Sequence, residues 1–266
     1  GLSAAGCKPI VEIQSAEALW SGLNQLANIL AKSYYLTDRR SGVQALIRVL
    51  VGNYPGSSPY QSQHIASVLL TIKGIKVVFP SDIADLKGLM RAAFADPNPV
   101  VILEHKSFYS SKMTHFFDAS DDYIVPLGKC RMVQQASQEQ SDEGYTCTVI
   151  TYGMGVHLAK QASEKHPGSV EILDLRTLHP LDFEEVVASV KRHGKALVLT
   201  EEPLQNSFAE ALAGRISKAC FKFLDAPVHT CGAAEVPTVP MNEKLAHAVL
   251  PTPEKIAKII GELLNY

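Results

Sequence analysis

The sequence lacks the short motifs that assign many enzymes directly. It has no G-x-G-x-x-G after a strand-like run, no G-x-x-x-x-G-K-[ST], no G-x-S-x-G and no H-E-x-x-H. These patterns mark dinucleotide-binding, nucleotide-binding, serine-hydrolase and zinc-protease sites, respectively. No local motif therefore assigns the chain to an enzyme class, and its chemistry has to be inferred from longer blocks of sequence.

The chain also lacks long apolar runs and an excess of charge of one sign. No stretch approaches about 18 apolar residues without a charge, so no membrane-spanning segment is expected. The 25 Lys and Arg residues are matched by 27 Asp and Glu residues, which argues against a nucleic-acid-binding protein. With 46% apolar residues, the chain has enough apolar surface to fold, which excludes intrinsic disorder.

Cysteine is scarce and forms no sequence motif. The number of cysteines, five, is odd and there is no C-x-x-C pair, which argues against a zinc site. Most lie in apolar runs, so we expect small core residues in a reducing compartment, the bacterial cytoplasm or its equivalent. Residues 1–6 have neither the basic nor the apolar region of a signal peptide, and we expect a piece of a longer chain.

Short apolar runs alternate with longer segments of helical periodicity. Apolar runs predict strands at 9–13, 45–51, 75–79, 100–103, 147–152, 170–175, 196–200 and 228–231. Helical spacing predicts helices over 16–32, 61–71, 82–95, 155–165, 182–192, 206–221 and 252–264. This alternation is typical of βαβ units, so we expect an α/β fold with parallel-rich sheets flanked by helices.

Polar connecting segments interrupt this alternation. The stretch 107–123 has no clear periodicity and predicts a linker between two domains, and 134–144 predicts a surface hairpin loop. Because parallel sheets bind ligands at the carboxyl ends of their strands, the loops at 52–63, 152–155 and 201–203 are candidate sites. The alternative is that their Gly and Pro residues only form tight turns.

Longer blocks of sequence carry a resemblance that local motifs do not. In the first half they are GLSAAGCKPIVEIQ (1–14), IRVLVG (47–52), SQ (62–63), GIKVVFPSDIADLKGLMRAAFADPNPVVILEHK (74–106) and VPLGK (125–129). In the second half they are ILDLRTLHPLDFE (172–184), EEP (201–203), FLDAPV (223–228) and CGAAEVPTVP (231–240). In these blocks the chain resembles the beta subunit of thiamine diphosphate-dependent 2-oxo acid dehydrogenases, of the pyruvate or branched-chain type.

The resemblance implies a fold, a domain division and partners. It implies a transketolase-like pyrimidine-binding domain over 1–106, lacking its first strands, and a transketolase C-terminal-like domain over 124–266. Thiamine diphosphate is expected between this chain and an alpha subunit or alpha domain, which holds Mg2+ and the diphosphate. The other expected partners are a second copy of the chain, bound through the C-terminal domain, and the lipoyl-acyltransferase core.

The resemblance also places one family residue outside the sequence. The glutamate that contacts the cofactor's aminopyrimidine ring in the family precedes the position that matches Gly1. That carboxyl group starts the acid–base chemistry that runs through the cofactor. We therefore expect the chain to be N-terminally truncated and inactive on its own.

Two departures from the family pattern fall at the expected site. The family has an aromatic residue against the pyrimidine where this sequence has Ala18, although Trp20 follows at another usually aromatic position. The family's catalytic His, in an H-S-Q loop, corresponds to Gln61, whose neutral amide cannot exchange a proton near pH 7. On a helix His64 would share a face with Gln61, and we hypothesise that it substitutes in part; the alternative is an ordinary surface histidine.

A potassium site carries over more completely. In the family, backbone carbonyls of an A-x-x-D-x-N turn bind a structural K+, and here the turn contains Ala93, Phe94, Asp96 and Asn98, with Leu46 as a further carbonyl donor. Unsatisfied carbonyls at a helix C-terminus suit a hard cation. The alternative is a plain C-cap turn in which Asn98 bonds its own backbone.

The activity implied by the resemblance is the decarboxylating component of a 2-oxo acid dehydrogenase complex. It would decarboxylate a 2-oxo acid and transfer the acyl group to the lipoyl group of the acyltransferase. One alternative is another thiamine enzyme, a transketolase or a deoxyxylulose-phosphate synthase. Because of Ala18 and Gln61, a catalytically degenerate assembly subunit is the second alternative.

Overall fold

The computed structural model describes residues 1–40, 42–53, 58–109 and 120–266, and it divides into two compact units. Unit 1 comprises Gly1–Lys129 and Arg176–Leu181, and unit 2 comprises Cys130–Leu175 and Asp182–Tyr266. The sequence predicts a linker over 107–123, of which residues 110–119 lie outside the described residues. Residues 124–129 pack with unit 1, and the chain returns to unit 1 for a short segment before completing unit 2.

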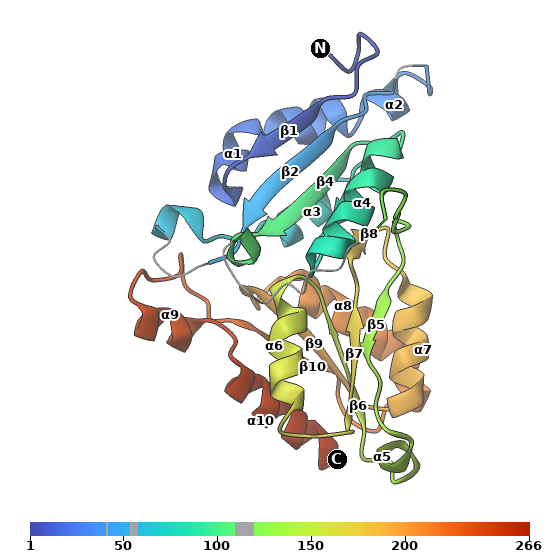
Figure 1. Cartoon of the computed structure of the whole chain (residues 1–266), viewed down its shortest axis with the longest axis vertical. Coiled ribbons are helices and arrows are strands. Elements are labelled where there is room, and N and C mark those ends of the chain that lie inside the picture. The colour runs from blue at the N-terminus through green and yellow to red at the C-terminus, as the bar shows by residue number, and fades with distance from the viewer. Residues whose placement is uncertain (41, 54–57, 110–119) are drawn as a thin grey trace. The chain divides into compact units, whose positions relative to one another are not determined.

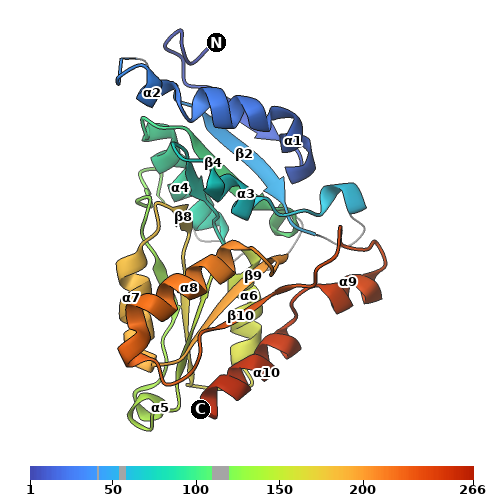
Figure 2. The ribbon, with the colours of Figure 1, turned by 180° about the vertical axis from the view of Figure 1, so that it is seen from behind.

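Unit 1 is built around a five-stranded sheet of order β1-β2-β4-β3-β8. Its strands are β1 (Ile10–Ile13), β2 (Leu46–Val51), β3 (Lys76–Val78), β4 (Val100–His105) and β8 (Thr177–His179). Its helices are α1 (Ala16–Asn24), α2 (Ser33–Leu36), α3 (Ala66–Thr71) and α4 (Ile83–Ala95), with a π-helix over Gln25–Leu30 and 3-10 turns over Pro59–Gln61 and Lys106–Tyr109. Figures 1 and 2 show α4 on one face of this sheet and α1 and α3 on the other.

Strand β8 joins the sheet of unit 1 from a distant part of the sequence. It pairs antiparallel with β3, whereas β1, β2, β4 and β3 pair in parallel with their neighbours. Arg176, just before β8, donates from Nη1 to Oδ1 of the buried Asp85 in α4 at 3.1 Å. This buried ion pair fixes the segment to unit 1, and the blocks of sequence did not predict the strand.

Unit 2 is a second five-stranded sheet, of order β10-β9-β6-β7-β5. Its strands are β5 (Arg131–Gln134), β6 (Cys147–Thr151), β7 (Val170–Asp174), β9 (Ala196–Pro203) and β10 (His229–Ala233). Its helices are α5 (Gln138–Asp142), α6 (Met154–Ser163), α7 (Phe183–His193), α8 (Phe208–Cys220), α9 (Glu243–Val249) and α10 (Pro253–Leu264). Edge strand β5 is antiparallel and the other neighbours are parallel, so both sheets are mixed but mostly parallel, as the alternation of elements predicts.

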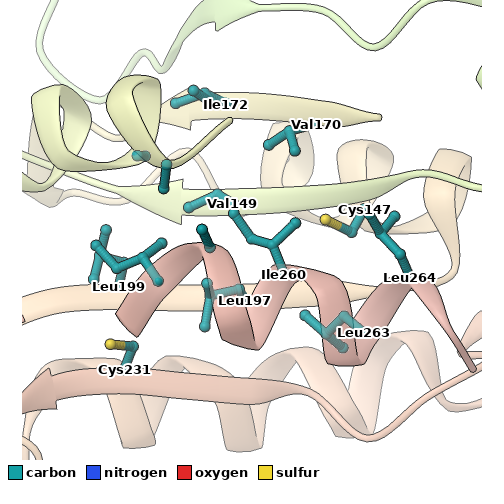
Figure 3. Close-up of a cluster of buried hydrophobic side chains, with 14 of the residues drawn as sticks. Cys147, Val149, Val170, Ile172, Leu197, Leu199, Cys231, Ile260, Leu263 and Leu264 are labelled. Carbon is teal, nitrogen blue, oxygen red and sulfur yellow. The ribbon is translucent and has the colours of Figure 1, made fainter. Parts of the chain in front are cut away.

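An apolar cluster of unit 2 lies between its sheet and α10. Figure 3 shows Ile260, Leu263 and Leu264 of α10 directed at strand residues that include Val149 and Leu197. The central strands β6 and β7 are buried on both faces, because helices cover both faces of a mostly parallel sheet. Cys147, Cys220 and Cys231 are buried, as expected for small core residues, whereas Cys7 is exposed.

Three predicted elements differ in the structure. Helix α3 begins at Ala66 rather than at 61. Residues 59–61 form a 3-10 turn, Ile65 has a non-helical φ of −133°, and the Gln63 carbonyl accepts from Gly52 N–H instead of from within a helix. The segment 134–144 is not a hairpin loop but contains α5, whose first turn is capped by Ser137. The predicted helix over 16–32 divides into α1 and the π-helix. Among the described residues, no helix combines the length and apolar character needed to cross a membrane.

Candidate functional site

The carboxyl ends of β2 and β4 lie side by side at one edge of the sheet of unit 1. The two strands are parallel neighbours, with Val51 opposite His105 at their ends. Gly52, the next residue, has a φ of +81°, and a Cβ there would lie 2.1 Å from His105 Nε2. Only glycine permits this approach, so the backbone after β2 packs directly against the His105 ring.

The Gln61–Gln63 segment lies at this edge and is bonded from several sides. One oxygen of the Glu17 carboxylate accepts the N–H groups of Ser62 at 2.8 Å and Gln63 at 2.9 Å. The Gln63 carbonyl accepts from Gly52 N–H at 3.2 Å, and Lys106 Nζ donates to the Gln61 carbonyl. The backbone of the segment is therefore fixed, while the Gln61 side chain is exposed.

Trp20 and Ala18 lie on α1 beside this segment. The indole Nε1 of Trp20 donates to Gln63 Oε1 at 3.5 Å, a long hydrogen bond, and the residue is 51% exposed. Ala18 is also exposed. Helix α1 is positioned by Ser15, whose hydroxyl caps its first turn, and by Leu19 on its buried face. The structure therefore brings Trp20 to the Gln61–Gln63 segment, with a half-exposed aromatic ring and an exposed methyl group on one helix.

His64 belongs to a ring cluster rather than to a helix face shared with Gln61. Its ring centroid lies 6.1 Å from that of Phe79 and 5.9 Å from that of His105. The prediction that Gln61 and His64 share a helical face is wrong, because α3 begins after both residues. The His105 Nδ1 accepts from Ser107 N–H at 3.3 Å. Sequence spacing offered no partner for His105, and the fold supplies His64.

A cavity of about 230 Å³ also opens near the ends of β3 and β4 in unit 1. Its polar lining includes Asp82, Glu104 and Tyr109. These groups are already engaged: Asp82 caps α4, and Arg48 donates to both oxygens of Glu104, at 2.6 and 2.7 Å, with Tyr109 on the same carboxylate. Burial, followed by the hydrogen bond to Glu104, raises the pKa of Tyr109 to about 12. One wall of the cavity is therefore formed by the neutral Tyr109 phenol and by the Arg48–Glu104 ion pair, whose charges are already paired.

The equivalent strand ends in unit 2 are closed by internal bonds. Tyr152, after β6, is 4% exposed, and its hydroxyl lies 2.8 Å from Thr200 Oγ1 on β9. Burial, and then the nearby Glu202, hold the pKa of Tyr152 well above its ordinary value. Gly232 has no room for a Cβ, which would lie 2.7 Å from the Glu202 carbonyl. The loops at 152–155 and 201–203 therefore match the alternative of tight structural turns better than an open site.

Comparisons with known proteins assign both halves of this fold. Residues 1–112 match the transketolase pyrimidine binding domain, and residues 136–256 match the transketolase C-terminal domain. The solved structure of a split-gene transketolase, an inactive beta4 tetramer, has a TM-score of 0.74 at 16% identity and covers 100% of this chain and 78% of that one. At that identity the likeness establishes the two-domain transketolase-like fold and no activity.

Sequence similarity to curated proteins is higher. Over 271 residues the chain is 32% identical to the 2-oxoisovalerate dehydrogenase subunit beta of Bacillus subtilis (strain 168), covering 100% of this chain and 80% of that protein. The chain belongs to the family of 2-oxo acid dehydrogenase beta subunits. It is also 31% identical to the pyruvate dehydrogenase E1 component subunit beta of Rhizobium meliloti (strain 1021), with 98% of this chain and 55% of that protein covered. The resemblance read from the blocks of sequence is confirmed.

In this family context, the last turn of α4 and the residues that follow it contain four of the five predicted potassium donors. The Asp96 N–H bonds to the Ala92 and Ala93 carbonyls at 3.0 and 3.3 Å, which ends the helix. Leu46 is separate: it lies in β2, and its N–H donates to Pro9 O. In a strand the N–H and C=O of one residue point to the same side, so the Leu46 carbonyl faces β1.

The Asp96 side chain already has partners at this turn. Its carboxylate contacts Lys76 Nζ at 2.5 Å and accepts from Asn98 N and Nδ2 at 2.9 and 2.8 Å. Burial raises the pKa of Asp96, but these bonds outweigh burial and hold it below its ordinary value. The carboxylate is thus committed to Lys76 and Asn98.

Sequence reasoning missed two residues of the site, Glu17 and Lys106. Both are charged residues close to residues that the sequence did single out, Ala18 on α1 and His105 at the end of β4. The bonds that they make join elements 45 positions apart in the chain, so no local spacing could reveal them. The family block that ends in LEHK at 103–106 includes Lys106, but it predicts no role for this residue.

Proposed function

We propose that this chain is the beta component of a thiamine diphosphate-dependent 2-oxo acid dehydrogenase that decarboxylates a 2-oxo acid and acylates a lipoyl group. The observation that carries the proposal is the fixed Gln61–Gln63 segment beside the half-exposed Trp20, at the carboxyl edge of a mostly parallel sheet. Open α/β sheets bind ligands at this edge. The similarity of the chain to family beta subunits along its whole length supports the same assignment.

Trp20 and Ala18 are the proposed contacts of the cofactor's aminopyrimidine ring. A half-exposed indole whose N–H is held by Gln63 presents a preset apolar face, which fits stacking on a flat heterocycle. Ala18 offers a methyl contact in place of an aromatic ring. Bound thiamine diphosphate supplies an electron sink that permits loss of CO2 from the 2-oxo acid. Mg2+ and the diphosphate are assigned to the alpha subunit or alpha domain.

Proton handling is the step in which this chain departs from its family. The exposed Gln61 amide can donate and accept hydrogen bonds, and so can orient a substrate, but it cannot take up a proton near pH 7. We propose that His64 supplies part of the missing acid–base function, as the nearest described imidazole along the chain. Its ring stands against His105, so the two imidazoles offer ring nitrogens at the same edge of unit 1.

The proposed assembly has three contacts beyond the chain. The alpha part completes the cofactor site, a second copy binds through the C-terminal-like domain, and the lipoyl-acyltransferase core receives the acyl group. In the same assembly, carbonyls of Ala93, Phe94, Asp96 and Asn98 are proposed to hold a structural K+. Leu46 is the weakest of the proposed donors, because its carbonyl faces β1.

A catalytically degenerate assembly subunit is the second candidate, and Ala18 and Gln61 favour it. Both replace family residues of the site with side chains that lack the aromatic ring or the imidazole, and both are exposed where the ligand would lie. Under this alternative the Gln61–Gln63 segment is only a structural surface. The two candidates differ in whether chemistry occurs, so activity separates them.

The deciding experiment is decarboxylation by the full-length protein that contains this chain, assembled with its alpha partner, with and without thiamine diphosphate. Pyruvate and 3-methyl-2-oxobutanoate are the two substrates, and CO2 release is the readout. Cofactor-dependent CO2 release from either acid supports the proposal. Normal assembly without CO2 release from either acid supports the degenerate subunit instead.

A further inference from the structure

The Gln61–Gln63 segment is held by two side chains of opposite charge from two different elements. Glu17 on α1 accepts the N–H groups of Ser62 and Gln63 through a single carboxylate oxygen, at 2.8 and 2.9 Å. Lys106, just after β4, donates its ammonium to the Gln61 carbonyl. Consecutive peptide groups of the segment are therefore fixed from both sides.

The hydrogen bonds from Ser62 and Gln63 to Glu17 matter for stability because this part of the backbone is buried. Ser62 is only 2% exposed, so its backbone N–H needs an internal acceptor. A carboxylate is a stronger acceptor than a neutral group, and it binds both N–H groups at once. Burial lowers the pKa of Lys106, while the charge of Glu17 counteracts this shift, so the two residues also support each other's charge.

We propose that Glu17 and Lys106 are positioning residues that fix the Gln61–Gln63 segment so that the Gln61 side chain stays at the edge of the sheet. The proposal deepens the proposed function and rests on it for its catalytic consequence. Neither residue reaches the reacting atoms; each acts through the peptide backbone of residues 61–63. A shift of about 1 Å in such a group can lower a rate by about 100-fold.

The molecule contains its own reporter for this segment. Trp20 is the one tryptophan of the sequence, and its Nε1 lies 3.5 Å from Gln63 Oε1. Its fluorescence therefore depends on whether Gln63 remains in place. This readout needs neither cofactor nor substrate, so it tests the positioning separately from the activity.

The experiment compares Glu17→Ala, Glu17→Gln and Lys106→Met with wild type. Glu17→Ala removes the acceptor, Glu17→Gln keeps an acceptor oxygen without the charge, and Lys106→Met removes only the bond to the Gln61 carbonyl. Glu12→Gln is the matched control, because Glu12 is half-exposed and pairs with Arg48 away from the segment. Circular dichroism checks that each variant is folded. If Glu17→Ala misfolds, Lys106→Met still tests the proposal, because it frees the Gln61 carbonyl and retains the Glu17 bonds.

For Glu17→Ala and Lys106→Met we expect a shifted Trp20 emission maximum and stronger acrylamide quenching. In the assembled enzyme, kcat for acylation of the lipoyl group should fall by about 10- to 100-fold, with KM for the 2-oxo acid within about twofold. Glu17→Gln should recover most of both signals, and Glu12→Gln should match wild type.

Unchanged Trp20 fluorescence in both Glu17→Ala and Lys106→Met overturns the proposal. So does a fluorescence change that leaves kcat at the wild-type value, because the segment would then move without consequence. If the wild-type assembly shows no decarboxylation, the proposed function fails instead. The fluorescence comparison then still decides the positioning: a shift supports it, and no shift overturns it.

Discussion

Units 1 and 2 have similar sheets but use their polar side chains differently. Each has five strands, mostly parallel, with one antiparallel edge strand. In unit 2 the buried Glu171 accepts from Ser189 at 2.6 Å and Arg192 at 2.8 Å, and lies 3.1 Å from His193. These bonds join β7 to α7 within unit 2, and they hold no loop outside these two elements.

In unit 1 the comparable polar groups hold a segment at the surface. Glu17 and Lys106 bond the backbone of residues 61–63, and the side chains of Gln61 and Trp20 remain exposed. Under the proposed function, unit 2 is a scaffold whose polar groups serve stability, whereas unit 1 orients side chains for a ligand. Changes in unit 2 should therefore alter stability first, and changes in unit 1 should alter activity first.

The largest expected effect is on the core of unit 2. Ile260 of α10 is 0% exposed and lies in the apolar cluster of Figure 3. Ile260→Ala should lower the free energy of unfolding by about 2–5 kcal/mol, because it removes apolar contacts and leaves a cavity. Urea denaturation followed by circular dichroism measures the change.

Ile259→Ala is the matched control, on the same helix but only partly buried, and it should cost clearly less. The native Trp20 emission should not change in either variant. A loss for Ile260→Ala no larger than that for Ile259→Ala would contradict the assignment of α10 to the core.

The next effect is on activity and tests the site in unit 1. Gln61→His restores an imidazole at the exposed end of the held segment and should raise acylation of the lipoyl group by about 10- to 100-fold. CO2 release should change little, because the substitution adds a group that handles protons in the transfer. Rapid-mix kinetics with a lipoyl domain measures both steps.

Gln61→Asn, which keeps an amide, is the control for Gln61→His. His64→Ala in the wild-type background should slow acyl transfer if His64 supplies part of the acid–base function. Unchanged transfer in His64→Ala would remove His64 from the site and favour the surface-histidine alternative.

The fold was largely predictable, because buried strands and amphipathic helices leave strong periodic patterns. The predicted helix over 182–192 is α7, which Gly194 ends with a φ of +67°. Strand β8 was not predicted: it is short, and it pairs with the distant β3, where Val77 lies opposite His179. The start of α3 was misplaced because the Gln63 carbonyl accepts from Gly52 N–H, a bond between separate segments that local sequence does not reveal.

The site was predictable only where the family pattern marks it. Gln61, Ala18 and Trp20 are predicted site residues that come from the resemblance to the family, and the structure brings Trp20 to Gln63. Glu17, Lys106 and the contact between His64 and His105 depend on which strand ends become neighbours. That information is in the sheet order and not in local sequence.

A smaller effect should appear in the pH dependence of unit 2. Burial raises the pKa of Glu171, but hydrogen bonds from His193, Arg192 and Ser189 outweigh burial and hold it below its ordinary value. The resulting stabilisation is complete above the unfolded pKa of about 4.3 and is lost as the pH falls through the folded pKa. Glu171→Gln should cost about 1–2 kcal/mol at neutral pH, and the difference from wild type should shrink below that window.

Urea denaturation at a series of pH values measures this difference. Glu185→Gln is the control, since Glu185 is exposed and bonds the same Arg192 at 3.3 Å. A gap between wild type and Glu171→Gln that stays constant down to acid pH would contradict the role given to the charge of Glu171.

The smallest expected effect concerns the turn after α4. If its carbonyls hold K+, potassium chloride should stabilise the protein by about 1 kcal/mol or less relative to lithium chloride. Lys76→Met should increase this dependence, because Lys76 places an ammonium on Asp96 beside the proposed ion. Equal Tm values in the two salts, in both wild type and Lys76→Met, would show that the turn is a plain C-cap.

The most direct test of the proposed function is the intact mass of a lipoyl domain incubated with the assembled protein, thiamine diphosphate and a 2-oxo acid. The account predicts a mass increase equal to the acyl group on one sulfur plus one hydrogen on the other, because the 2-oxo acid without CO2 adds across the lipoyl disulfide. It also predicts that this product depends on both the 2-oxo acid and the cofactor. A lipoyl domain of unchanged mass with pyruvate and with 3-methyl-2-oxobutanoate would contradict the central claim.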